Sequence, residues 1–222
     1  MNLAALIAVA RERLDDEIEP YLVSDTSLAA WATEAEREAC LRARLLFDDE
    51  PGEPTVIRIG PGQGVYRLDP RVLFVDTADL IWGDGSRPFR LPLKGLDWIR
   101  ERSRSASSNG TPEVVADDGR GRLHLWPRPL RAGRLHLAVY RAPLTPLVEP
   151  DDEPEIGREH HEGLLDWMLY RAFQIKDREL EDVARAALAL AEFARRFGDR
   201  PTADVLRRHR ERRRTITRYG GY

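Results

Sequence analysis

One stretch decides how this chain is organised: Pro154-Glu155-Ile156-Gly157-Arg158-Glu159-His160-His161-Glu162-Gly163-Leu164-Leu165-Asp166-Trp167-Met168-Leu169-Tyr170-Arg171-Ala172-Phe173. It begins as an acidic loop that contains prolines and continues as a helix, because its apolar residues recur at spacings of three and four. One helical face is predicted to carry Leu164, Leu165, Met168, Leu169, Ala172 and Phe173. The residues before this stretch alternate as strands do. The order along the chain is therefore helices, a β-rich insert, and helices again.

Two amphipathic helices are predicted before the insert. The first is ended by Pro20, and its apolar stripe consists of Leu3, Leu6, Ile7, Ala10, Leu14 and Ile18. The second begins within the N-cap cluster at residues 24–27. Its stripe consists of Leu28, Trp31, Ala35, Ala39 and Leu46. The alanines on this stripe indicate close contact between helices.

Short strands with frequent turns are predicted for the insert. They cover residues 55–59, 65–68, 72–75, 89–93, 113–116, 123–126 and 135–140, with a short helix near Leu96-Asp97-Trp98-Ile99. Trp82-Gly83-Asp84-Gly85 is typical of a hairpin turn. Residues 122–126 and 134–138 alternate strictly, and we expect them to pair across the loop at 127–133. This pattern favours a small antiparallel sandwich or barrel.

A second C-terminal helix follows the first, and we expect Gly198 to cap it. Its predicted core-facing stripe is Leu180, Val183, Ala184, Ala187, Leu188, Ala191 and Ala194. The predicted fold class is α+β: one helical bundle from both ends of the chain, an inserted antiparallel β-sandwich or barrel-like subdomain, and an extended basic C-terminal tail. The predicted boundaries are 1–48 and 158–206 for the bundle, 49–143 for the insert, 144–157 for an acidic Pro-rich linker, and 207–222 for the tail.

Composition narrows the classes of function. The 222 residues are 42% hydrophobic and 33% charged, with a net charge of −3, which is typical of a globular protein and not of a nucleic-acid binder as a whole. Cys40 is the sole cysteine, so no internal disulfide forms, and its helical setting predicts a buried side chain. We expect no signal peptide, because charged residues follow the apolar N-terminus at once, and no membrane span. A cytosolic protein is expected unless an assembly carries it out.

No active site, metal site or cofactor is predicted. His161-Glu162 lacks the second histidine of a zincin helix, because Leu165 occupies that position, and adjacent histidines diverge on a helix. We expect a satisfied histidine there instead. Gly60, Gly62 and Gly64 fit no phosphate-binding pattern and predict a turn. The acidic runs at 15–17 and 48–50 are expected to be solvated. His124 and His136 fall on polar positions of alternating strands.

The C-terminal tail is the most distinctive charged segment. Seven arginines lie within twelve residues, from Arg207 to Arg218, and the chain ends Tyr219-Gly220-Gly221-Tyr222. Three interpretations remain open. The tail is a solvated, frayed helix end; or it contacts nucleic-acid phosphates; or it docks into an acidic groove of a partner protein, with the tyrosines as anchors. The linker at 149–155 is acidic, so pairing between the linker of one subunit and the tail of its neighbour is a further hypothesis.

Several segments, taken in order, resemble one family. They are Trp31-Ala32-Thr33-Glu34-Ala35-Glu36-Arg37-Glu38-Ala39-Cys40, Tyr66-Arg67-Leu68-Asp69-Pro70, Val139-Tyr140-Arg141-Ala142-Pro143, the 154–173 stretch, and Arg195-Arg196-Phe197-Gly198. Their order and spacing resemble those of the head-to-tail adaptor (connector) proteins of short-tailed bacteriophages, over nearly the whole chain. Gly157 and His160 depart from the family pattern, where proline and tyrosine are expected.

This resemblance implies a structural virion protein, assembled in the host cytoplasm, with no catalytic residues. It implies a dodecameric ring that binds the portal protein, extends the DNA channel, allows non-specific contact with the DNA there, and presents the insert to a tail (nozzle or tube) protein. The C-terminal region of the family reaches the portal. The implied portal-docking residues are therefore Arg207, Arg208, Arg212, Arg213, Arg214, Tyr219 and Tyr222. The alternative is a nucleic-acid-binding protein that uses the same arginines.

Overall fold

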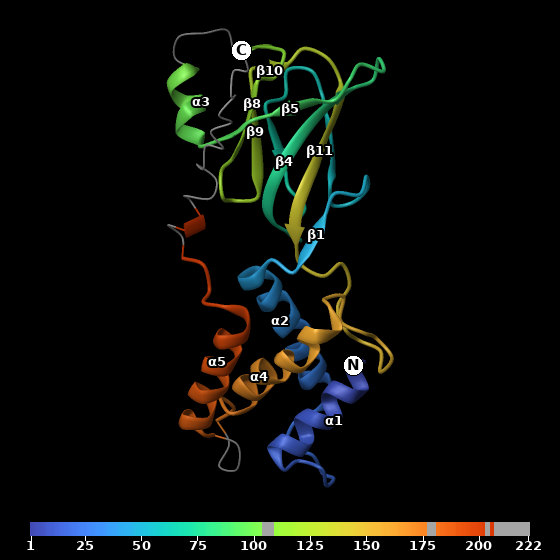
Figure 1. The fold of residues 1–222 in the computed structure, drawn as a ribbon, viewed down its shortest axis with the longest axis vertical. Helices are drawn as coiled ribbons and strands as arrows, with labels where there is room; N and C mark the ends of the chain where they lie inside the picture. The colour runs from blue at the N-terminus through green and yellow to red at the C-terminus, as the bar shows by residue number, and fades with distance from the viewer. Residues whose placement is uncertain (104–108, 177–180, 203–204, 207–222) are drawn as a thin grey trace, which may run out of the picture. The chain divides into compact units, whose positions relative to one another are not determined.

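A computed structural model describes residues 1–103, 109–176, 181–202 and 205–206, and these form an α+β chain (Figure 1). The chain divides into two compact units, each described here by itself. The helical unit combines Met1–Phe47 with Tyr140–Pro201, so it contains both the blue and the orange-to-red helices of Figure 1. The β unit contains Asp48–Val139.

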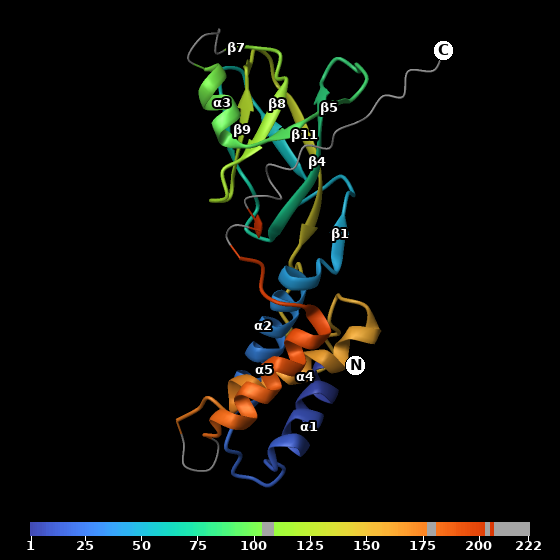
Figure 2. The same cartoon turned by 60° about the vertical axis from the view of Figure 1, so that its left-hand side comes forward.

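Four α-helices make up most of the helical unit: α1 (Leu3–Leu14), α2 (Asp25–Ala43), α4 (His161–Ala172) and α5 (Val183–Phe197), with the short 3₁₀ turn η1 (Arg158–His160) before α4. Ser24 caps α2, because its side chain accepts a hydrogen bond from the Ser27 N–H, as the cluster of N-cap residues predicted. α4 packs against α1, α2 and α5, and its course beside α5 is visible in Figure 2. It is the central helix of this unit.

α4 matches its prediction closely. Leu164, Leu165 and Met168 are fully buried, and Ala172 and Phe173 are buried with them. Gly163 lies on the same helix against the Phe197 ring of α5, where a Cβ would come within 2.8 Å of two ring carbons. The glycine therefore lets α5 approach α4 closely.

α5 buries a different face from the one predicted. Ala186, Ala189, Phe193 and Phe197 are buried, whereas Val183, Ala184, Ala187, Leu188 and Ala191 are exposed. Leu180 lies outside the described residues. The physical reason is the size of the side chains: two phenylalanine rings bury far more apolar surface than the alanines opposite them. Phe193 lies 5.0 Å from Trp167 and 4.7 Å from Phe197, centroid to centroid.

α1 is shorter than predicted. It ends at Leu14, and Asp15 adopts a left-handed conformation with φ of 57°. Ile18, which the periodicity placed on the buried stripe, is 85% exposed. The helix ends because the carboxylate of Asp16 accepts the backbone N–H groups of Leu22 and Val23, which holds the following chain in a loop.

The β unit contains two larger sheets. One has the order β1-β11-β4-β5, with β2 also paired to β11, and the other has the order β3-β9-β8-β6. The strands are β1 (Leu46–Asp48), β2 (Val56–Ile59), β3 (Val65–Arg67), β4 (Val72–Trp82), β5 (Phe89–Leu91), β6 (Leu93–Lys94), β8 (Val114–Asp117), β9 (Arg122–Trp126) and β11 (Gly133–Arg141). The helix α3 (Leu96–Arg102) follows β6 as predicted.

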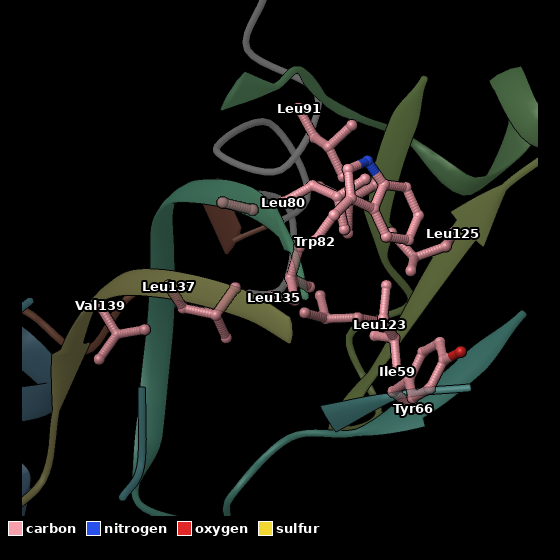
Figure 3. Close-up of a cluster of buried hydrophobic side chains, with 12 residues drawn as sticks. Ile59, Tyr66, Leu80, Trp82, Leu91, Leu123, Leu125, Leu135, Leu137 and Val139 are labelled. Carbon is pink, nitrogen blue, oxygen red and sulfur yellow. The ribbon is translucent and has the colours of Figure 1, made fainter. Parts of the chain in front are cut away.

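One hydrophobic core is shared by these two sheets. Figure 3 shows Leu80, Trp82, Leu135 and Leu137 of the first sheet together with Leu123 and Leu125 of β9, and the two sets of side chains face each other. The alternation seen in the sequence explains this core, since β11 buries Leu135, Leu137 and Val139 in turn.

Two expectations about pairing are wrong. β9 and β11 do not pair with each other: β9 pairs with β3 and β8, and β11 belongs to the other sheet. Their connection contains β10 (Arg128–Pro129), which pairs with β7 (Asn109–Gly110), and Pro127 and Pro129 lack the N–H groups that a hairpin ladder needs. The pairing is also not purely antiparallel, because β6–β8 and β7–β10 are parallel. The hairpin at Trp82 is confirmed by the antiparallel β4–β5 pair.

Candidate interaction surfaces

The residues implied in portal docking cannot be placed. Arg207, Arg208, Arg212, Arg213, Arg214, Tyr219 and Tyr222 all lie outside the described residues. The surfaces described below belong to the helical unit. Two of them depend on buried polar groups that the sequence patterns missed.

Arg11 is the first of these groups. Its guanidinium is buried and donates to the Asp16 carboxylate at 2.8 Å, to the Val23 carbonyl at 2.9 Å and to the Asp25 carboxylate at 2.5 Å. It also lies 3.6 Å from the centroid of the Tyr21 ring. A buried guanidinium needs this number of partners, because five N–H donors leave water at once. Arg11 thus fixes the loop between α1 and α2.

Asp16 contradicts the expectation that the acidic run at 15–17 is solvated, since it is only 3% exposed. It fixes the same loop from the other side, through the N–H groups of Leu22 and Val23. The loop in turn presents apolar side chains to solvent: Ile18 is 85% exposed and Leu22 43%. No sequence pattern predicts this arrangement, because the side chains of Arg11 and Asp16 come together only where the helix ends.

Glu36 is the second buried group, on α2. Its Oε1 atom accepts the N–H of Glu155 at 2.5 Å and the N–H of Ile156 at 3.1 Å, so it holds the acidic segment against the helix. Burial raises the pKa of Glu36, and the two backbone hydrogen bonds oppose that rise. Beside it, Arg141 donates to the Glu155 carboxylate at 2.5 Å. The segment expected to be a linker is therefore attached to the helical unit.

Asp152 organises the same segment by accepting the N–H groups of Val148 and Glu149, both at 2.8 Å. These hydrogen bonds lower the pKa of the Asp152 carboxyl. The side chains of Glu149 and Asp151 remain exposed. Glu153 and Glu155 are exposed as well, but they pair with Arg158 and Arg141, respectively.

His161 is a buried, satisfied histidine, as expected. Its Nε2 lies 3.0 Å from the Ile156 carbonyl and its Nδ1 lies 2.8 Å from the Met1 ammonium group. The carbonyl requires Nε2 to donate, so Nδ1 accepts from the ammonium group. Within the described ranges, no three His, Cys, Asp or Glu side chains come together as metal ligands would.

Cys40 is fully buried in α2, as predicted, and burial raises the pKa of its thiol to about 12. A thiol with so high a pKa forms almost no thiolate at neutral pH, so it does not react as a nucleophile. Gly60, Gly62 and Gly64 form the turn between β2 and β3, and Gly62 has a φ of +74°.

Comparison with known proteins decides the family. The family model described as "SU10 adaptor protein" matches residues 1–218, which is nearly the whole chain. The chain belongs to the SU10 adaptor protein family. The resemblance to phage adaptors seen in the sequence is therefore confirmed, and this SU10 adaptor family member is a structural component of a bacteriophage virion. No curated protein matches the chain.

The match includes most of the basic tail as well as both units, because it extends to residue 218. In the part of the chain that the structure describes, none of the helices has the length and apolar character needed to cross a bilayer. The role of an SU10 adaptor is structural, so its surfaces are where its function must be sought.

Proposed function

We propose that this chain forms the head-to-tail adaptor ring of its phage, which docks on the portal protein, extends the DNA channel and provides the platform to which the tail attaches. The ring is a dodecamer, and the tail (nozzle or tube) protein binds on the side of the β-rich insert. The observation that carries this proposal is the family match over residues 1–218.

The arrangement of the helical unit supports the proposal. Helices from both ends of the chain pack together around α4, which leaves the β unit as an insertion between α2 and α4. We further propose that the four helices form one bundle and that the two sheets form a sandwich. Such a chain offers two chemically different modules, one for each neighbour in the virion.

The docking residues of this proposal are Arg207, Arg208, Arg212, Arg213, Arg214, Tyr219 and Tyr222. Arginine forks pair bidentately with carboxylates, and tyrosine rings bury a large apolar area at low entropic cost. These residues find their acidic partner only on the portal, so the free subunit is expected to be monomeric or weakly associated.

The test is co-expression with the portal protein of the same phage, followed by native mass measurement and electron microscopy. The full chain is expected to add a ring to the portal. A chain that ends at residue 206 is expected to lose it, and a variant with the five docking arginines changed to glutamine is expected to bind far more weakly.

The control changes the same five arginines to lysine, which keeps the charge and removes the fork. Retained binding by this variant would show that charge alone suffices. A ring that survives truncation would keep the adaptor function and move the docking surface to the helices. No ring in any variant, with steeply salt-dependent DNA binding by the free chain, would favour the nucleic-acid-binding alternative.

A further inference from the structure

α5 has an apolar face on each side. Its inner face is buried through Phe193 and Phe197. Directly opposite, at helical spacing, an outer face presents Ala184, Ala187, Leu188 and Ala191, and it ends at Arg195. Leu188 is 65% exposed, and Val183 at the edge of this face is 76% exposed. This outer face is therefore an exposed apolar surface that a neighbouring chain can cover.

α1 has the same property on the other flank of the helical unit. Its residues 3–10, Leu-Ala-Ala-Leu-Ile-Ala-Val-Ala, include no polar side chain. Leu3, Leu6 and Ala10 are buried, whereas Ala4 and Ala8 are exposed and continue at the same spacing to Glu12. α4 packs against both α1 and α5 (Figure 1), and Arg185 of α5 donates a hydrogen bond to the Arg13 carbonyl near the end of α1. The outer-face alanines of both helices nevertheless stay exposed, so these two faces do not cover each other within one chain.

The two faces are complementary in length and charge. On α1, Ala4, Ala8 and Glu12 follow at intervals of four; on α5, Ala187, Ala191 and Arg195 do the same. Glu12 has no ion-pair partner among the residues that the structure describes. Arg195 is 68% exposed in its side chain and pairs with Glu192 at the surface. A parallel alignment places alanine against alanine and Glu12 against Arg195.

We propose that the outer face of α1 in one subunit packs in parallel against the outer face of α5 in the next copy of this chain. The inference rests on the ring proposed above and names the surfaces that close it. Because the two faces differ, the contact is heterologous, and a heterologous contact produces a ring or filament rather than a closed dimer. Alanine at the contact permits an interaxial distance of about 8 Å, the short end of the usual range.

Disulfide trapping tests both the partner and the direction. Ala4→Cys with Ala187→Cys marks the parallel alignment, and Ala4→Cys with Ala191→Cys marks the antiparallel one. A shift of four residues moves a position about 6 Å along a helix, and a disulfide forms only when the two Cα atoms approach within about 7 Å. Native Cys40 is buried, so it is expected to form no cross-links of its own.

The full-length variants are oxidised mildly at a concentration of about 1 mM, at which a micromolar contact is saturated. A4C/A187C in one chain is expected to give a ladder of multimers, whereas A4C/A191C is expected to give little product. A mixture of the two single variants, A4C and A187C, is expected to give dimers only. Efficient cross-linking of A187C alone, a stronger ladder from A4C/A191C, or no ladder at all would each overturn the proposal.

A second measurement does not depend on cysteine. Leu188→Asp is expected to weaken self-association by about tenfold to hundredfold, because a leucine contributes about 1.5–3 kcal/mol when it leaves water. Leu130→Asp is the matched control, since Leu130 is a leucine of similar exposure (68%) that belongs to the β unit and to neither of the two helices. Equal loss in the two variants would contradict the proposal. If the cross-linked ladder forms but the chain does not bind the portal protein, only the adaptor function is refuted.

Discussion

The position of Glu36 in the fold favours the neutral, protonated form of its side chain over the charged form. Its Oε1 atom accepts two backbone N–H groups of the acidic segment, and burial raises its pKa above the ordinary 4.5. The folded state therefore holds a proton more tightly than the unfolded state does. The stability that this proton provides is present at low pH and is lost as the pH rises from 4.5 through the raised value.

Glu36→Gln is accordingly expected to flatten the pH dependence of unfolding above pH 4.5 and to leave the protein at least as stable at neutral pH. The amide oxygen still accepts both N–H groups, and no charge is buried. Thermal unfolding followed by circular dichroism over a pH series measures this. Glu36→Ala is the contrasting variant, expected to lose about 1–3 kcal/mol because two N–H groups lose their acceptor. A glutamine variant as unstable as the alanine variant would contradict the account.

Arg11 differs from Glu36, because its positive charge is buried together with the negative charge of Asp16 and compensates it. Arg11→Met removes the guanidinium from the Asp16 carboxylate and is expected to cost about 3–5 kcal/mol, the usual result of leaving one member of a buried pair alone. Adding Asp16→Asn should recover part of this loss, since the asparagine oxygen still accepts a backbone N–H without burying a charge. Chemical denaturation of the single and double variants checks this. A double variant less stable than Arg11→Met would rule out charge burial as the cause.

At the scale of elements, the close contact of α4 with α5 depends on Gly163. Glycine to alanine inside a helix normally stabilises it by up to about 1 kcal/mol. Here a Cβ would lie 2.8 Å from two carbons of the buried Phe197 ring. Gly163→Ala is therefore expected to destabilise the protein by about 1–3 kcal/mol through overpacking.

The control for this prediction is Gly83→Ala, because a Cβ at Gly83 meets nothing within 4 Å and the position has no positive φ. Its unfolding midpoint should stay close to that of the native protein. If Gly163→Ala raised the midpoint, α5 would have to move away from α4 at little energetic cost, and the close packing would not be a constraint.

The same elements show which features of the fold the hydrophobic periodicity of the sequence predicts and which it does not. It placed α4, most of α2 and most strands correctly, because each buries one face of a regular repeat. It also located α3, although none of the residues of this helix is fully buried. Leu46, which was predicted on the stripe of α2, instead begins β1, because α2 ends at Ala43. Periodicity misplaced α5, where apolar residues occupy both faces and only the size of Phe193 and Phe197 decides which is inside. It paired β9 with β11, because alternation reports which residues are buried and carries no information about the partner strand.

At the scale of the whole molecule, family membership could be inferred from the order of weak motifs, whereas the interaction surfaces could not. The tail was recognised by its charge alone and lies outside the described residues. The outer faces of α1 and α5 became visible only when the packing of α4 showed which apolar residues stay exposed. A surface is defined by what the fold leaves uncovered, so it follows from the complete packing and not from any one segment.

Pairing between the acidic segment and the basic tail of a neighbouring subunit remains a prediction for the assembled particle. Internal hydrogen bonds already engage Asp152 and Glu155, and Glu153 pairs with Arg158, so the acids most available to a neighbour are Glu149 and Asp151. Changing them to glutamine and asparagine is expected to weaken ring assembly, and more so at low salt, where screening is least. Assembly is measured by native mass over a salt series.

The matched control is Glu17→Gln with Glu19→Gln, which removes the same charge from exposed positions of the same unit. If both double variants lose assembly equally, the effect reflects net charge and not a specific contact. If neither changes it, the tail is engaged elsewhere. Loss confined to the Glu149 and Asp151 variant would give each subunit a polar contact with its neighbour in addition to the apolar contact of α1 with α5. Two different contacts of moderate strength suit a ring that closes on its portal, because neither alone needs to hold the free subunits together.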